Sequence, residues 1–377
     1  MEESNRGQSE LEEKVLKQGL CTGCGACVGI CPYQASYQDK TVILFPCDIK
    51  NGRCYAFCPR TPGDAAVLGE KLFSKRDLTP EIGAVKAFYI ARAKDESLRA
   101  EAQHGGTVTA LMTLALAEGL IDTAVVAEPG ENFLPHGIAV TESAALRRQA
   151  KSKFVVSPTL AEFNRVAAGP SAGIGVVATP CQALALAKMR LKPVPENDNH
   201  IDKLKLVVGL FCGWALSWSK LSALLKAKVE LSDVKGMDIP PSKYHTLELY
   251  TTGGTINVPL EEVIPCVRPG CHYCADMTAE YADISVGSAR LAEGWEVARG
   301  WNQVIVRTDV GRRLLDLAAK RGVLEFLDAP EENLEKLKKA SMGKKRTAIQ
   351  NLTAKSGSSS DLLYLNPQDP ALASMVE

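Results

Sequence analysis

The sequence predicts an α/β fold with α+β character, in which a small cysteine-rich N-terminal module precedes a larger domain with a mixed sheet. Two observations carry this prediction. Cysteines crowd the first 60 residues, and beyond residue 84 short β-rich runs alternate with helical runs, which is typical of an α/β sheet. At 377 residues the chain is long enough for two or three domains. The expected boundaries are 1–71 for the module, 72–84 for a linker, 85–330 for the larger domain, and 331–377 for a basic helix and flexible tail.

The module opens with a run that reads C-x2-C-x2-C-x3-C-P, from Cys21 to Pro32. This spacing is typical of bacterial ferredoxins, in which three close thiolates hold one iron–sulfur cubane and the fourth Cys belongs to another cluster. A zinc knuckle or a disulfide framework is the alternative. The tight spacing, the near absence of aromatic and His residues between the thiols, and the final Cys-Pro favour iron. The predicted ligands of the first cluster are Cys21, Cys24, Cys27 and Cys58.

A second run, Cys54-x3-Cys58-Pro59, ends the module. In the two-cluster ferredoxin pattern, the fourth Cys of the first run, Cys31, is then a ligand of the second cluster. Asn51 stands where the middle Cys of that cluster is expected, and the first Cys comes one residue early. The predicted thiolates are Cys31, Cys47 and Cys54. The fourth position stays open between Asp48, a distant Cys such as Cys266, and no ligand, which would leave a three-iron cluster or a vacant site.

Composition narrows the class of protein. Apolar residues make up 46% and charged residues 23%, and Lys+Arg equals Asp+Glu at 44 each, which argues against a nucleic-acid binder. The polar, acidic N-terminal stretch does not read as a signal peptide, and no apolar run reaches the roughly 18 residues of a membrane span. Twelve cysteines in such a chain indicate metal rather than disulfides, and we expect a cytoplasmic protein.

The larger domain is expected to alternate strands and helices before it becomes closer to α+β. The expected strands are 84–93, 122–128, 173–178 and 203–213, and the helices between and after them are 107–120, 179–190 and 218–229. Later strands are expected within 243–260, 282–287 and 302–308, followed by helices 311–322 and 331–355 and a Ser-rich tail at 356–360.

A Gly-Gly pair opens the helix expected at 107. Free N–H groups at a helix N-terminus bind phosphate, and glycine lets a phosphate approach closely. Such a pair is more often a plain turn, so alone it does not establish a nucleotide site.

Four further cysteines follow strand ends in the larger domain. Cys181 starts a helix, where the helix dipole stabilises a thiolate, although an inert buried Cys is the alternative. Cys212 ends the next strand, in the region where α/β folds place functional loops. The predicted ligands of a further iron–sulfur cluster are Cys181, Cys212, Cys271 and Cys274, while His272 would suit zinc. The 12 cysteines would fill three cubanes only with Cys266 in the second one.

Motifs in this order resemble a known family: CTGCGACVGICP with GRCYAFCPR, GGTVTALMTLALAEGLIDTAVV, ATPCQALAL, GLFCGW and CHYCADMTAEYADISVG. They resemble the beta subunits of coenzyme F420-reducing hydrogenases and dehydrogenases, from about Gly19 to Thr308, with WEVARG as an apparent insertion after Gly294. The family includes F420-handling subunits of hydrogenase, formate dehydrogenase and F420H2 dehydrogenase complexes, and similar ferredoxin-linked chlorophyll-type reductases. Its members bind FAD, pass electrons through iron–sulfur clusters, and exchange a hydride with the deazaflavin or another acceptor.

The resemblance implies that the larger domain binds FAD beside the cluster of Cys181. The implied flavin contacts are Gln103, His104, Gly105, Gly106, Thr107, Thr109, Lys151, Ser152, Lys153 and Thr179. Asp276, Thr278, Glu280 and Asp283 follow the Cys pair, with turn formation and capping as the alternative to flavin contacts. The basic helix Lys336–Arg346 would suit an acidic coenzyme or partner, but a solvated helix face is the favoured interpretation.

These parts imply an oxidoreductase component of a larger complex, because a flavin converts a hydride into single electrons. The expected partners are other subunits of a hydrogenase, formate dehydrogenase or heterodisulfide-reductase-type complex, or a ferredoxin, with a deazaflavin or similar hydride carrier as substrate. No side chain is assigned as a catalytic acid or base. Two alternatives are a ferredoxin-dependent flavoprotein reductase of an organic substrate and a flavin-less electron-transfer adaptor.

Overall fold

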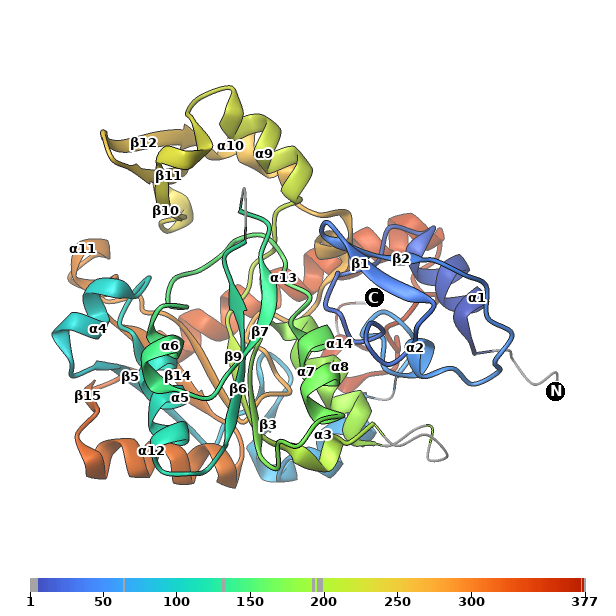
Figure 1. The fold of residues 1–377 in the computed structure, drawn as a ribbon, viewed down its shortest axis with the longest axis horizontal. Helices are drawn as coiled ribbons and strands as arrows, with labels where there is room; N and C mark the ends of the chain where they lie inside the picture. Colours follow the sequence, from blue (N-terminus) through green and yellow to red (C-terminus); the bar gives the residue numbers. More distant parts are fainter. Residues whose placement is uncertain are drawn as a thin grey trace.

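The computed structural model describes residues 6–63, 65–130, 133–191, 194, 199–373 and 375. At its centre is a mixed eight-stranded sheet with strand order β15-β5-β14-β13-β9-β8-β6-β7 (Figure 1). The strands are β5 Ala87–Ala93, β6 Thr123–Glu128, β7 His136–Val140, β8 Ile174–Ala178, β9 Leu204–Leu210, β13 Ile284–Ser288, β14 Asn302–Val306 and β15 Leu324–Leu327. The four central strands β13, β9, β8 and β6 are parallel, and antiparallel pairs complete both edges. The predicted mixed sheet is confirmed.

Helices cover both faces of this sheet. The side chains of β6 alternate between the two faces: Ala124 and Val126 pack on one side and Val125 packs on the other. The first face is covered by α5 Thr107–Ala117, α6 Ser143–Arg147 and α12 Asp309–Arg321, and the second by α7 Thr159–Ala167 and α8 Pro180–Arg190. A short helix, α4 Glu96–Glu101, follows β5. The larger domain therefore has three layers.

The N-terminal module lies beside the second face, next to α7 and α8 (Figure 1). Its elements are α1 Gln8–Leu11 with a π-helical turn Glu12–Leu16, β1 Gln34–Tyr37, β2 Lys40–Ile43 and α2 Arg53–Ala56. The segment that follows contains α3 Ala65–Leu72, β3 Leu78–Thr79 and β4 Gly83–Ala84. The stretch predicted as a linker is anchored, because the buried Arg307 donates hydrogen bonds to the carbonyls of Ile82 and Ala84 at 2.6 and 2.8 Å.

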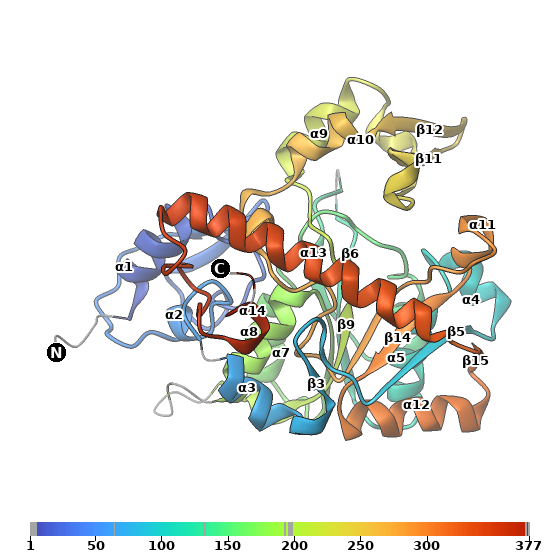
Figure 2. The ribbon, with the colours of Figure 1, turned by 180° about the vertical axis from the view of Figure 1, so that it is seen from behind.

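A smaller unit projects from the sheet and has a hydrophobic core of its own (Figures 1 and 2). It consists of α9 Trp218–Lys226, α10 Leu260–Val263 and the antiparallel strands β10 Val234–Asp238, β11 Thr246–Thr251 and β12 Gly254–Pro259. The strands expected after residue 282 join the main sheet instead, as β13 and β14. Between them lies the short helix α11 Trp295–Ala298.

The 26-residue helix α13 Glu331–Ser356 crosses the back of the molecule towards the N-terminal module (Figure 2). The expectation of a solvated basic face is wrong at its centre, because Lys345 is only 4% exposed and pairs with Glu280 at 2.5 Å. The structure also differs from the prediction of a flexible tail after α13, for the residues that it describes there. Leu362 and Tyr364 pack against α13, because the tail carries apolar side chains that cover this helix, and it ends in α14 Pro370–Ala373.

Candidate functional site

Four thiols of the N-terminal module line one small cavity: Cys21, Cys24, Cys27 and Cys58. These are the residues predicted to hold the first cluster, and the structure brings all four together. Apolar side chains such as Leu11 and Val15 form the rest of the wall. Burial raises the pKa of Cys58 to about 11, while nearby Lys188 opposes the shift. A bound cationic cluster would relieve this penalty on the thiolate form.

The loop of the first set is pressed against the larger domain. Gly25 has a φ of +85°, and a Cβ there would lie 2.6 Å from the Pro158 carbonyl oxygen. The Leu160 amide donates a hydrogen bond to the Cys24 carbonyl at 3.1 Å. The Arg268 guanidinium donates to the carbonyl of Thr22 at 2.6 Å. The module is therefore docked on α7 through a loop that requires glycine.

The second set consists of Cys31, Cys47 and Cys54. Burial raises the pKa of Cys54, hydrogen bonds from the Tyr55 amide and the Gln34 side chain oppose the shift, and Cys31 and Cys47 add to it. Asp48 is exposed. Cys266 packs instead in the core of the β10–β12 unit, with its Sγ 3.9 Å from the Glu262 carbonyl oxygen. The structure does not bring Cys266 to the second set, because it is part of a separate hydrophobic core.

The third set, here called the core set, consists of Cys181, Cys212, Cys271 and Cys274. Burial raises the pKa of Cys212 and of Cys271, and neighbouring thiols of the set add to both shifts. Cys181 lies in the first turn of α8, Cys212 follows β9, and Cys271 lies in the 3-10 turn Pro269–Tyr273. The backbone amide of Ala215 donates to Cys271 Sγ at 3.4 Å. The fold thus assembles four cysteines from three distant segments.

Two buried cations, Arg60 and Lys344, face the core set. Burial alone would raise the pKa of Cys274, but these two cations more than offset it and lower the value. Lys344 Nζ donates to the carbonyls of Cys212 and Asp276 at 2.7 and 2.8 Å. Buried cations offset the negative charge of four thiolates around a cluster. The sequence reasoning missed both residues.

Arg60 also joins the core set to the first set. Its backbone amide donates to Cys58 Sγ at 3.4 Å, and its guanidinium, 5% exposed, donates to the Gly270 carbonyl at 3.2 Å and to the Tyr364 hydroxyl. Cys24 of the first set and Cys181 of the core set belong to one hydrophobic cluster and interact electrostatically. The two predicted cluster sites therefore adjoin. The one feature of the sequence that could have pointed to Arg60 is its position directly after the Cys58-Pro59 pair.

All 12 cysteines are free thiols. Within the described ranges, no group of three or more His, Cys, Asp or Glu side chains is spaced to hold a single metal ion. The thiols of the first set surround a cavity instead, and an all-thiolate donor set suits an iron–sulfur cluster.

The segments predicted to contact a flavin lie next to each other. The amide of Ser152 donates to Gln103 Oε1 at 3.3 Å, which joins the 151–153 segment to the loop before α5. Gln103 Nε2 donates in turn to the Met237 carbonyl of the β10–β12 unit at 3.1 Å. Lys153 is largely buried, and burial together with nearby Lys151 lowers its pKa to about 8. These segments meet between the main sheet and the projecting unit.

Some residues of the predicted flavin site have structural partners. Thr107 is buried, and its hydroxyl donates to the Ala91 carbonyl at 3.3 Å. Gly105 packs so closely that a Cβ would lie 2.7 Å from Asn302 Oδ1, and Gly106 is the left-handed N-cap residue of α5. Thr179 forms the capping box of α8, and Thr109 is half-buried on α5. The close packing and the caps account for these residue types without a ligand.

Around His104, several buried polar atoms have no hydrogen-bond partner among the residues described. They include His104 Nδ1, Trp295 Nε1 and Asp238 Oδ2. The rings of His104 and Trp295 lie 5.5 Å apart, and burial with nearby Arg290 and Arg299 lowers the pKa of His104 to about 4. The apparent insertion thus supplies Trp295 and Arg299. Unsatisfied donors and acceptors of this kind fit a heterocycle with polar edges, such as a flavin.

The acidic residues after Cys274 form turns and ion pairs. Asp276 accepts hydrogen bonds from the amides of Thr278 and Glu280, each at 2.9 Å, and Asp283 accepts one from the Val207 amide at 2.8 Å. Their capping role is therefore present in the structure.

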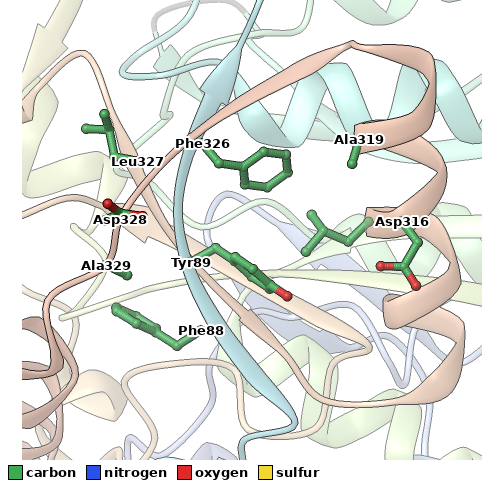
Figure 3. Close-up of a pocket in the computed structure, with 9 residues that line it drawn as sticks. Phe88, Tyr89, Asp316, Ala319, Phe326, Leu327, Asp328 and Ala329 are labelled. Carbon is green, nitrogen blue, oxygen red and sulfur yellow. The ribbon is translucent and has the colours of Figure 1, made fainter.

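A separate cavity of about 450 Å³ lies between α12 and the β5–β15 edge, where Tyr89 and Phe326 meet at an angle (Figure 3). None of its lining residues is a cysteine, so this cavity is not part of the thiol sites.

Comparison with known proteins defines the class of this fold and site. Residues 88–163 and 172–332 match the N-terminal and C-terminal models of the coenzyme F420 hydrogenase/dehydrogenase beta subunit. Residues 15–37 match the 4Fe-4S binding domain. The chain belongs to the family of F420 hydrogenase/dehydrogenase beta subunits, as the resemblance of the motifs predicted, and its N-terminal module contains a 4Fe-4S binding domain.

Individual relatives support this assignment. The coenzyme F420 hydrogenase beta subunit of Methanothermobacter thermautotrophicus is 33% identical over 280 residues, covering 73% of this chain and 96% of that protein. A subunit of the F420H2 dehydrogenase of Methanosarcina mazei is 29% identical over 332 residues, covering 85% and 88%. In the solved F420-reducing NiFe hydrogenase complex from Methanosarcina barkeri, one chain is similar at a TM-score of 0.65 and 28% identity, covering 73% of this chain and 95% of that one.

Proposed function

We propose that this protein is an iron–sulfur flavoprotein subunit that exchanges a hydride with coenzyme F420 or a similar carrier and passes the electrons through its cysteine-held clusters to a partner. The observation that carries the proposal is the link between the first set and the core set through Arg60, whose backbone amide donates to Cys58 Sγ and whose guanidinium donates to the Gly270 carbonyl next to Cys271. Clusters held by adjoining sets lie in series, and a series of clusters serves electron transfer. The relatives named for F420 hydrogenase and F420H2 dehydrogenase support the hydride carrier.

The residues of the chain have separate roles in this proposal. Gln103, His104 and Ser152 would hold FAD between the main sheet and the β10–β12 unit, with Lys151 and Lys153 near its diphosphate. FAD bound there would supply the conversion of a hydride into single electrons. Lys344 of α13 and Arg60 compensate the charge of the core-set thiolates. The partner would be another subunit of a redox complex or a ferredoxin.

The helices described in this structure include none that is both long enough and apolar enough to span a membrane.

Cofactor content and reduction kinetics of the anaerobically purified protein test the proposal. Iron, acid-labile sulfide and flavin are quantified first, and the protein is then mixed with reduced F420 or with NADH. We expect flavin and at least two clusters, with bleaching of both by reduced F420. Clusters without flavin would replace the proposal with an electron-transfer adaptor, and reduction by ferredoxin alone would favour a ferredoxin-dependent reductase.

A further inference from the structure

The segment after α13 lies beyond the part of the chain that matches the family models, which ends at residue 332. It nevertheless returns to the junction of the N-terminal module and the larger domain. Leu363 packs against the apolar core of the module, to which three thiols of the first set also belong. Leu362 and Tyr364 pack against α13, and Tyr364 is only 5% exposed. This segment therefore places a tyrosine in the interior, close to the predicted cluster sites.

The hydroxyl of Tyr364 joins Arg60 to the 3-10 turn Pro269–Tyr273. Arg60 donates to this hydroxyl through Nη1, and the central carbon of its guanidinium lies 4.7 Å from the centre of the Tyr364 ring. The hydroxyl donates in turn to the Tyr273 carbonyl at 2.5 Å, and Nη2 of Arg60 donates to the Gly270 carbonyl at 3.2 Å. Both terminal nitrogens of the guanidinium are thus fixed against the turn that carries Cys271.

A tight, strained turn of the backbone presents Tyr364 in this position. Leu363 has a left-handed backbone with a φ of +57°, which is uncommon for a bulky side chain. Its amide donates to Asp361 Oδ1 at 2.9 Å, and the Leu365 amide donates to the Leu362 carbonyl at 3.1 Å. Strained residues persist where the surrounding contacts hold them, and they gather at functional sites.

A second pair of the same chemistry lies far from the thiols. Arg312 donates through Nη1 to the Tyr89 hydroxyl at 2.7 Å, and the central carbon of its guanidinium lies 5.9 Å from the centre of that ring. This pair joins α12 to β5, on the face of the sheet away from the module. It provides an internal comparison, because it has the same hydrogen bond and the same ring contact without neighbouring cysteines.

We propose that Tyr364 is a positioning residue that holds the Arg60 guanidinium between the first set and the core set and thereby sets the reduction potential of the core cluster. The inference rests on the proposed function only in requiring that both sets hold iron–sulfur clusters. A cation fixed near a cluster favours its more negative, reduced state. Without the hydroxyl, Nη1 becomes a buried donor that lacks an acceptor, so the guanidinium turns towards another acceptor and the core cluster becomes harder to reduce.

The test is an EPR-monitored potentiometric titration of the full chain, purified without oxygen. It compares the wild type, Tyr364→Phe, Arg60→Gln and the double variant at equal iron content. We expect Tyr364→Phe to lower the ratio of reduced to oxidised core cluster at a fixed potential by about tenfold, and Arg60→Gln to lower it further. The double variant should match Arg60→Gln, because the hydroxyl acts only through the guanidinium. Tyr89→Phe is the matched control and should leave the ratio unchanged.

Several outcomes would overturn the inference: an unchanged ratio in Tyr364→Phe, an equal shift in Tyr89→Phe, or shifts that add in the double variant. If Tyr364→Phe loses iron, the double variant decides, because removing both partners relieves the unpaired donor. Recovered iron would support the inference, and a persistent loss would contradict it. A wild-type chain without clusters would contradict the proposed function, whereas intact clusters with additive shifts would contradict only the role of Tyr364.

Discussion

Replacing Arg60 by Gln removes a buried positive charge from the junction of the first set and the core set. The guanidinium is 5% exposed and faces Cys274 and Cys181, so water screens it little. At an effective dielectric of about 20, two unit charges roughly 6 Å apart interact by about 3 kcal/mol, and we take this as the size of the effect of the guanidinium on the core cluster. Because the positive charge favours the more negative, reduced cluster, its loss should lower the one-electron potential of the core cluster by about 0.1 V.

An EPR-monitored potentiometric titration of the anaerobic protein measures this shift. Arg60→Lys keeps the charge and should stay close to the wild type, while Lys344→Gln should lower the core potential as Arg60→Gln does. Lys188→Gln serves as the matched control, because Lys188 Nζ donates to the Cys58 carbonyl at 2.7 Å and should affect the first cluster alone. An Arg60→Gln protein with full iron content and unchanged potentials would refute the reasoning.

Three further outcomes are expected. Lys345→Met should lower the free energy of unfolding by about 3–5 kcal/mol in urea titrations, since it leaves the buried Glu280 carboxylate without its partner; a loss below about 1 kcal/mol would argue against a buried pair. Gly25→Ala should reduce iron per chain, because its Cβ would meet the Pro158 carbonyl at 2.6 Å in a left-handed conformation, and normal iron content would contradict the docking described above. Cys266→Ala should leave iron and sulfide unchanged, and a loss of iron would show that this residue is a ligand.

Much of the fold follows from periodicity in the sequence. The continuous apolar runs of β6, β8 and β9 are typical of strands buried on both faces, and these strands form the parallel centre of the sheet. The separate β10–β12 unit and the return of β13 and β14 to the main sheet depend on long-range pairing, which local patterns do not encode. Local patterns also did not predict the buried part of α13. Lysine is usually a surface residue, but Lys345 pairs with Glu280 from a distant segment of the chain.

The candidate site was predictable where spacing dictates chemistry. Close cysteine runs in the module and Cys271-x2-Cys274 pointed to iron, and the structure gathers the first set and the core set as expected. Residues that act through tertiary contact carried no motif. Arg60 reaches the core set from the module. A single Arg has no spacing that marks it.

The central claim is that electrons pass from a hydride carrier at the larger domain through the core set to the N-terminal module. Freeze-quench EPR after mixing the protein with reduced F420 tests it most directly, with Arg60→Gln and Lys188→Gln used to assign each cluster signal by its shifted potential. The account predicts that the core cluster is reduced first and the first cluster after it. Reduction of the module without prior or concurrent reduction of the core cluster would contradict the claim.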